Sequence, residues 1–337
     1  MIITKTPFRM SFFGGGTDIE SFFREHGGAV ISTTFDKYCY VIVRHLPRFF
    51  DYKTHLTYSK MEYVSQYEEI NHPAIREAMR MLDIHEIHLT YDADLPARSG
   101  LGTSSSFAVG MLNAFYCLKG KYVDRKKLAD DAIYLERSAC HEAGGWQDQI
   151  AASYGGFNRI NFSSEGYDVA PVIISPDRKK QLEENLLMFF TGFVRYSSEV
   201  QEKNASSSID KTKKLKKMLD LVDQAEMILV DQNKDLSEFG SLLDESWKMK
   251  RGTGSSVSTD EIDRLYDAGM YAGAIGGKLL GAGGGGFLIF YVPKERQDAV
   301  REAMKNLLYI PFHFEDTGTQ VIHYTPEGYD LEKGVLL

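Results

Sequence analysis

The sequence is poor in the residues that mark several special classes of protein. Only three of its 337 residues are cysteine, and Cys39, Cys117 and Cys140 lack the spacing of a metal site. We therefore expect reduced thiols inside a folded core, with neither disulfides nor zinc. Basic residues are outnumbered, 39 against 47 acidic ones. The net charge of -8 argues against binding to nucleic acid, which requires a basic surface.

Long apolar runs are absent as well. No stretch approaches the roughly 20 apolar residues that a membrane helix needs. Residues 1–7 also lack the apolar region of a signal peptide. These absences predict a cytoplasmic protein that makes no membrane contact. The hydrophobic content of 43% over 337 residues is enough for a substantial core and for two domains.

The signatures of three nucleotide-binding classes are missing. No Walker loop occurs, because no glycine is followed at the required spacing by Gly-Lys-Ser or Gly-Lys-Thr. Neither the His-Arg-Asp loop nor the Asp-Phe-Gly triplet of protein kinases is present. The glycines of Gly281–Gly286 run into an apolar, strand-like stretch at 287–292. A dinucleotide-binding fingerprint would enter a helix at that point.

Two glycine-rich loops are present, at Pro96–Ser106 and Gly281–Phe287. The first loop leads into the apolar run Phe107–Leu118, which predicts a buried helix that begins inside the loop. A helix start offers unpaired N–H groups to an anion, and glycines allow the backbone to approach it closely. The hydroxyls of Thr103–Ser106 add ligands for a polyphosphate or its metal. We interpret this loop as a nucleotide phosphate site supported by the second loop, the alternative being a structural Ser/Gly turn.

Hydrophobic periodicity predicts a mixture of strands and helices. We expect strands at 2–6, 29–35, 38–44, 87–91, 185–191, 287–292 and 318–324. We expect helices at 19–25, 74–82, from 104 onward, 126–141, over about 198–250 and at 259–272. A turn-rich segment near 163–166 suggests two domains, 1–165 and 166–337, with the ligand between them.

Three motifs in this order resemble those of the GHMP kinases, named after galactokinase, homoserine kinase, mevalonate kinase and phosphomevalonate kinase. The motifs are Pro7-Phe8-Arg9 with Gly14–Asp18, then Pro96–Ser105, then Gly281–Phe287. The resemblance covers nearly the whole chain. It implies an α+β fold whose ATP-binding N-terminal domain is like domain 2 of ribosomal protein S5. It also implies a ferredoxin-like C-terminal domain, with the active site between the two.

The resemblance also implies the catalytic residues and the ATP site. Asp148 matches the base that accepts or orients the proton of the attacking hydroxyl, and Arg9 belongs beside it. Ser104 and Glu136 match the Mg2+ ligands, with Glu142 as a weaker candidate. The plain alternatives are a surface ion pair for Arg9 and a surface helix carboxylate for Glu136. The expected phosphate-binding residues are Ser99, Gly100, Leu101, Gly102, Thr103, Ser104 and Ser105.

The substrate motif favours a sugar. Family members of the mevalonate type usually carry lysine where this chain has Arg9, whereas sugar kinases carry arginine. In those enzymes an aspartate at the place of Asp18 accepts hydrogen bonds from ring hydroxyls; a helix-capping role for Asp18 is the plain alternative, and the two roles are compatible. The expected substrate-binding residues are Gly15, Gly16, Thr17, Asp18, Gly145, Arg195, Gly284 and Gly285.

The chain departs from galactokinases at Gly15 and Gly16, where those enzymes have glutamate and histidine. Losing an acid and gaining space would admit a longer or phosphorylated exocyclic arm, because a carboxylate there would repel a phosphate. This version of the motif is most similar to kinases of D-glycero-D-manno-heptose 7-phosphate. These use ATP and Mg2+ to phosphorylate the anomeric hydroxyl, for nucleotide-activated heptose in bacterial surface glycans.

Several alternatives stay open. The cations that would hold the distal phosphate include Arg195, which ranks first, and also Lys250, Arg251, Lys5 and Arg98. The substrate could instead be that of a fucokinase-like or galactokinase-like enzyme. A mevalonate or homoserine kinase is disfavoured by Arg9 and Asp18. A non-catalytic sugar or nucleotide sensor would not need the base Asp148. The expected partners are ATP and a small sugar phosphate, and a homo-oligomer is compatible with the sequence.

Overall fold

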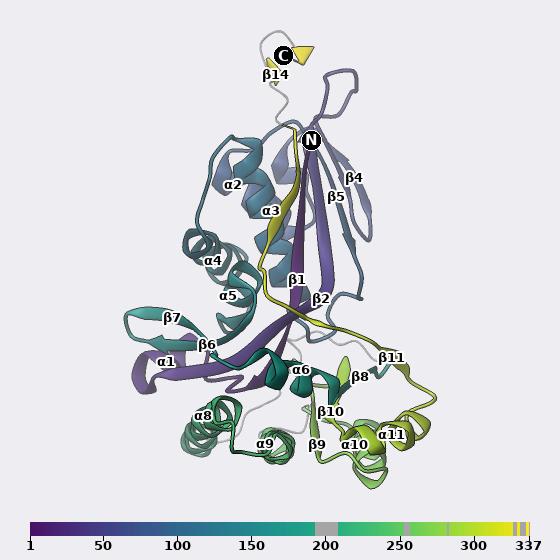
Figure 1. Cartoon of the computed structure of the whole chain (residues 1–337). Helices are drawn as coiled ribbons and strands as arrows, with labels where there is room; N and C mark the ends of the chain where they lie inside the picture. Colours follow the sequence, from purple (N-terminus) through teal and green to yellow (C-terminus); the bar gives the residue numbers. More distant parts are fainter. Residues whose placement is uncertain (193–207, 253–256, 282, 326–328, 331–334, 337) are drawn as a thin grey trace.

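Two long antiparallel strands form the spine of the molecule (Figure 1). β1 (Ile2–Phe13) pairs with β2 (Gly28–His45) from one end to the other, and the last eight residues of β1 are all buried. The two strands predicted at 29–35 and 38–44 are thus one continuous strand, β2. The computed structural model describes residues 1–192, 208–252, 257–281, 283–325, 329–330 and 335–336.

A mixed sheet grows around this spine in the order β13-β1-β2-β5-β3-β4. The length of β2 lets β6 pair with its first half and β5 with its second half, while β7 extends β6 and β12 adds to β2. Three strands beyond residue 165, namely β7, β12 and β13, therefore belong to the first sheet. The division at 165 stays a prediction. The strand bounds are β3 Thr54–Thr57, β4 Met61–Val64, β5 Ile87–Ala93, β6 Phe157–Ser163, β7 Gly166–Pro171, β12 Phe314–Glu315 and β13 Gln320–Tyr324.

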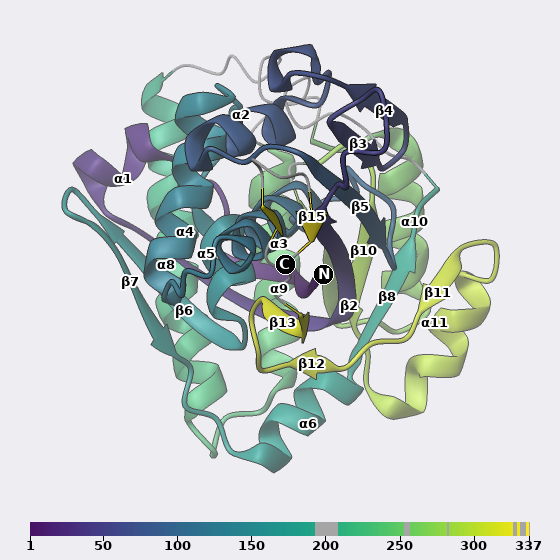
Figure 2. The ribbon, with the colours of Figure 1, turned by 90° about the horizontal axis from the view of Figure 1, so that it is seen from above.

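Helices cover one face of this sheet, with α3 (Thr103–Leu118) at their centre (Figure 2). The predicted helix after the first glycine loop is confirmed, and it packs against both β1 and β2 because nearly all of its residues are apolar or small. The single helix predicted at 126–141 is instead α4 followed by a π-helical turn, η2. The remaining bounds are α1 Glu20–His26, η1 Tyr67–Glu69, α2 Pro73–Leu82, α4 Arg125–Ile133, η2 Tyr134–Ala139 and α5 Gln147–Tyr154.

A second, four-stranded antiparallel sheet has the order β11-β8-β10-β9. Its core contains Trp247, Tyr266 and Phe290, which are almost fully buried. The helices predicted over about 198–250 are α8 and α9, and residues 198–207 lie outside the described part of the chain. The bounds are α6 Pro176–Glu184, β8 Leu186–Phe190, α8 Ser208–Val230, α9 Ser237–Arg251, α10 Asp260–Tyr271, β9 Gly276–Leu279, β10 Phe287–Tyr291, η3 Lys294–Arg296, α11 Gln297–Ala303, β11 Leu308–Ile310, β14 Tyr329–Asp330 and β15 Val335–Leu336.

The two sheets meet where β1 ends, close to α8 and α9 (Figure 1). Phe12 and Phe13 pack edge-on against Phe239 of α9, with ring centroids 5.4 and 5.1 Å apart. One apolar cluster therefore runs through both halves and fixes their junction. The core position predicted for the cysteines is confirmed for Cys39, which is buried, whereas Cys117 and Cys140 are only partly buried. Within the described residues no helix is long and apolar enough to span a bilayer.

Candidate active site

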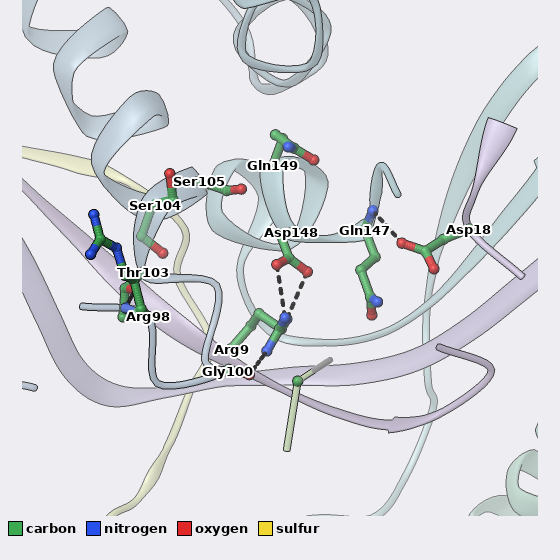
Figure 3. A network of polar contacts seen from close by, with 12 residues as sticks. Arg9, Asp18, Arg98, Gly100, Thr103, Ser104, Ser105, Gln147, Asp148 and Gln149 are labelled. Carbon is green, nitrogen blue, oxygen red and sulfur yellow. Dashed lines mark hydrogen bonds and ion pairs between the residues drawn. The ribbon is translucent and has the colours of Figure 1, made fainter. Parts of the chain in front are cut away.

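Arg9 and Asp148 form a two-pronged ion pair at this junction (Figure 3). Arg9 Nε donates to Asp148 Oδ1 and Nη2 donates to Oδ2, both at 2.8 Å. The arginine side chain is 5% exposed and the aspartate side chain 25%, so only the carboxylate can be reached from outside. Asp148 lies in the first turn of α5, where the helix dipole favours a negative charge. The structure thus brings the two predicted catalytic residues together.

Arg9 also holds the first glycine loop. Its Nη1 donates to the Gly100 carbonyl at 2.6 Å, and its backbone N–H donates to the Leu101 carbonyl at 3.1 Å. A Cβ at Gly102 would lie 3.2 Å from Arg9 Cγ, so glycine gives the arginine its space. α3 begins at the next residue, Thr103, whose Oγ1 accepts a hydrogen bond from the Arg98 N–H at 3.2 Å. The loop is therefore anchored on the same strand that carries the ion pair.

The two glycine-rich loops contact each other through their backbones. A Cβ at Gly100, where φ is +85°, would lie 2.3 Å from the Leu280 carbonyl oxygen. A Cβ at Gly286 would lie 2.2 Å from the carbonyl oxygen of Ser99, which is itself fully buried. The second loop is thus a wall for the first, as the sequence indicated. Gly284 and Gly285 are buried in this wall, and a substrate contact from them stays a prediction.

A second polar cluster surrounds Glu136, which lies on η2 and is 1% exposed. Ser104 Oγ donates to Oε1 at 3.0 Å, and Ser105 Oγ donates to Oε2 at 2.6 Å. Gln149 Nε2 also donates to Oε2, and an Arg137 nitrogen lies 3.8 Å away. Glu136 is thus no surface carboxylate, whereas the weaker candidate Glu142 is exposed.

The donors around Glu136 suit Mg2+. A hydroxyl oxygen of Ser104 and a carboxylate oxygen lie within hydrogen-bond distance of each other, and Mg2+ prefers hard oxygen ligands. No group of three or more His, Cys, Asp or Glu side chains suited to a metal occurs among the residues that the structure describes. An ion held here would therefore take its other ligands from phosphate oxygens and water, as Mg2+ commonly does.

Asp18 lies beside the ion pair and is 3% exposed. Its carboxylate accepts the N–H groups of Gly16 at 2.8 Å and Gln147 at 3.3 Å. Burial, followed by the charge of Asp148, raises its pKa above the usual value. The capping role considered for Asp18 is wrong, because the residue before α1 is Ile19 and no side chain caps this helix.

Gly145 shapes the floor of the Asp18 site. A Cβ at this position would lie 1.8 Å from Asp18 Oδ2, so only glycine fits without displacing the carboxylate. Thr17 is fully buried, and its hydroxyl donates to the carbonyls of Gly14 and Ala29 at 2.8 and 2.9 Å. These bonds tie Thr17 to the turn, and a substrate contact from its side chain stays a prediction.

Two lysines from the second half of the chain add positive charge. Lys278 on β9 is 4% exposed, and its Nζ donates to the carbonyls of Ser11 and Phe12 at 2.9 and 2.6 Å. Lys250 on α9 donates to the Gly281 carbonyl. Burial and then Arg9 lower the pKa of Lys250 to about 8, while Asp18 opposes the shift. Burial, Lys250 and Arg9 also lower the pKa of Lys278.

The cations predicted for a distal phosphate have different surroundings. Arg251 pairs with Asp263 at 3.0 Å, and the Lys5 ammonium lies 4.1 Å from the centre of the Tyr38 ring. Arg195 lies outside the described residues. Lys250 is therefore the predicted cation that the structure links to Arg9 and Asp18. Sequence reasoning assigned no role to Lys278, although a lysine inside the apolar Gly-Gly-Lys-Leu-Leu run was a detectable signal.

Comparison with known proteins agrees with this geometry. The family model for the GHMP kinases N terminal domain matches residues 67–156, and the model for GHMP kinases C terminal matches residues 224–310. D-glycero-alpha-D-manno-heptose 7-phosphate kinase from Campylobacter jejuni is 30% identical over 95% of this chain and 98% of its own length. The bifunctional fucokinase/GDP-fucose pyrophosphorylase of Arabidopsis thaliana is 30% identical over 63% of this chain, which corresponds to 21% of that protein.

A solved structure shows the same fold. The crystal structure of a D-glycero-D-manno-heptose 1-phosphate kinase from Bacteroides thetaiotaomicron superimposes with a TM-score of 0.77. The match covers 96% of this chain and 99% of that one, at 24% sequence identity. The α+β architecture predicted from the motifs is therefore confirmed.

Proposed function

The chain belongs to the GHMP kinase family, and we propose that it phosphorylates the anomeric hydroxyl of D-glycero-D-manno-heptose 7-phosphate. The general activity, that of an ATP-dependent sugar kinase, follows from the chain's relatives. The observation that carries the finer proposal is the Arg9–Asp148 pair beside the glycine loop, in a chain 30% identical along its length to a heptose 7-phosphate kinase. The product would serve the nucleotide activation of heptose for surface glycans.

Asp148 is placed to act as the base. The anomeric O–H gives its proton to an Asp148 carboxylate oxygen while the sugar oxygen bonds to the γ-phosphorus, and the bond from that phosphorus to the β-phosphate oxygen breaks to release ADP. Arg9 holds the carboxylate in place through two hydrogen bonds and would balance charge on the phosphoryl group. N–H groups at the start of α3 would bind the ATP phosphates. Mg2+ held by Ser104 and Glu136 would neutralise phosphate charge when bound.

The choice of a phosphorylated sugar rests on charge. Gly15 and Gly16 supply no acid where galactokinases carry one, so the carboxylate that would repel a phosphate is missing from these two positions. Arg9, Lys250 and Lys278 act on one another electrostatically, as the lowered pKa values of both lysines indicate. Among the described residues, Asp18 and Asp148 are carboxylates that interact with this basic group, and an anionic substrate would add negative charge beside it.

The test is an ADP-release assay with Mg-ATP against heptose 7-phosphate, heptose 1-phosphate, mannose, fucose, galactose and mevalonate. We expect turnover with heptose 7-phosphate and a new anomeric phosphate signal in the phosphorus NMR spectrum. Turnover of heptose 1-phosphate would move the reaction to another hydroxyl, and turnover of fucose or galactose would change the substrate. Binding without turnover across the panel would indicate a sensor.

A further inference from the structure

We propose that Ser11 and the carboxamide of Gln147, on either side of Gly15, form the subsite that receives the phosphorylated arm of the sugar. The inference rests on the proposed function and names the groups that would select its substrate. It is carried by the space above Gly15, by two buried polar atoms without partners, and by the position of Ser11 on β1.

The space above Gly15 opens onto two polar side chains. A Cβ at this position would lie 3.7 Å from Ser11 Oγ and 3.8 Å from Gln147 Nε2, and apart from the adjacent glycines no other atom of the described residues lies within 4 Å. Figure 3 shows the Gln147 side chain pointing into the region between Arg9 and Asp18. The missing side chain of Gly15 thus leaves room for a substrate group between a hydroxyl and an amide.

Both side chains carry a buried atom that lacks a hydrogen-bond partner in the described part of the molecule. These atoms are Ser11 Oγ and Gln147 Oε1. Ser11 is 6% exposed, so bulk water reaches its hydroxyl poorly. Buried polar groups are nearly always paired in folded proteins, and an unpaired one needs an explanation. A substrate hydroxyl between them would satisfy both, because it can donate to Gln147 Oε1 and accept from Ser11 Oγ. A phosphate oxygen would instead accept from Ser11 Oγ and from Gln147 Nε2, the amide nitrogen that faces Gly15.

The position of Ser11 suits the far end of the sugar. Arg9 and Ser11 are two residues apart on β1, so their side chains project from the same face, with their Cα atoms about 7 Å apart. Arg9 binds the phosphate loop and Asp148, which places the reacting oxygen at its end of the site. Ser11 lies further along the strand, away from that loop. A sugar whose anomeric carbon faces Asp148 would therefore direct its exocyclic arm toward Ser11.

The charge at this end fits a phosphate. The Lys278 ammonium binds the carbonyls of Ser11 and Phe12, and the pKa of Lys278 is lowered in part by Lys250. The Lys250 ammonium also interacts electrostatically with Arg9 and Asp18. Its electrostatic interactions and its hydrogen bond to the Gly281 carbonyl place Lys250 between Arg9, Asp18 and the second glycine-rich loop. Lys278, which donates to the Ser11 carbonyl, is the basic side chain that a hydrogen bond places beside the subsite.

The test compares Gly15→Ala, Ser11→Ala and Gln147→Ala with the wild-type protein. An added methyl at Gly15 meets only ordinary contacts and no left-handed backbone, so this variant should fold normally while it fills the subsite. We expect each change to raise the KM for heptose 7-phosphate about tenfold, the scale of a lost hydrogen bond to a charged group. The KM for ATP should not change. Ser153→Ala is the matched control, because it removes another buried hydroxyl without a partner, at the far end of α5, and should leave both KM values unchanged.

A fourth variant tests the charge. Gly15→Glu should lower kcat/KM for heptose 7-phosphate far more than for heptose without the phosphate, because the new carboxylate repels only the phosphorylated arm. Unchanged KM values for heptose 7-phosphate in all three alanine variants would overturn the subsite while leaving the proposed function standing. Failure of the wild-type protein to turn over any sugar phosphate would instead overturn both.

Discussion

Two polar clusters of the site hold a carboxylate in opposite ways. Asp148 is paired with one cation, Arg9, and a quarter of its side chain is exposed. Glu136 is 1% exposed and is held by neutral donors, the hydroxyls of Ser104 and Ser105 and the amide of Gln149. The Arg137 nitrogen, 3.8 Å away, is its described ion-pair partner. The Asp148 cluster is thus open: its charge is balanced by Arg9 and solvent reaches it. The Glu136 cluster is closed: its charge is poorly balanced and it is shielded from solvent.

The difference teaches what each cluster can do. An open carboxylate with a bidentate arginine can receive a proton from a substrate without being buried as an isolated charge. A buried carboxylate that is held mainly by neutral donors is poorly solvated and lacks a close countercharge. A bound cation would supply that charge. The geometry therefore supports proton transfer at Asp148 and metal binding at Glu136.

The largest effect should come from breaking the open cluster. Asp148→Asn keeps the shape but removes the proton acceptor, so we expect turnover to fall about a thousandfold, within the range for general-base catalysis. ATP affinity, measured by calorimetry, should stay the same because the phosphate loop is intact. Asp168→Asn on the exposed face of β7 is the control. Turnover within a few-fold of wild type would show that Asp148 is not the base.

A smaller effect should follow from the closed cluster. Glu136→Gln removes the negative charge, so we expect the Mg2+ concentration for half-maximal activity to rise about tenfold, the scale of a weakened metal site. The neighbouring exposed Glu142→Gln is the matched control. Thermal unfolding should be followed in parallel, because the new amide would meet the donors that now serve the carboxylate. A rise in the half-maximal Mg2+ concentration in Glu142→Gln, but not in Glu136→Gln, would assign the metal site to Glu142.

The smallest effect should be a pH dependence of sugar-phosphate binding beside the Arg9–Asp148 pair. Lys250 loses its proton as the pH rises through its pKa of about 8, so the KM for heptose 7-phosphate should rise a few-fold above this pH while Mg2+ activation does not change. The unfolded chain holds this proton up to about pH 10.5. As the pH rises from about 8 to about 10.5, the free energy of unfolding should therefore increase. The affinity of Lys250 for phosphate falls over the same range.

Lys250→Arg is the informative variant for this dependence, because an arginine stays charged throughout the range. Its KM profile for the sugar phosphate should be flat above pH 8. A rise that persists in this variant would assign the titration to another group, with Lys278 the first to test.

Local sequence patterns predicted much of the fold and part of the site. The glycines and the apolar run after Gly102 predicted the start of α3, and the motif residues Arg9 and Asp148 do meet. The single helix at 126–141 was wrong in detail, because a π-helical turn breaks it at η2 and brings Glu136 to Ser104. The capping role of Asp18 was wrong because its carboxylate binds Gln147, which is distant in the sequence.

The sequence by itself determined the family, the phosphate loop and the chemical types of the catalytic side chains, since these are written in short motifs. Only the tertiary structure showed that Lys278 reaches Ser11 and that Gln147 and Ser11 flank Gly15. These groups come from β1, α5 and β9, and their side chains have no mutual pattern in the chain. They meet because Phe12, Phe13 and Phe239 share one core, which fixes the two sheets against each other and so sets the spacing of every charge between them.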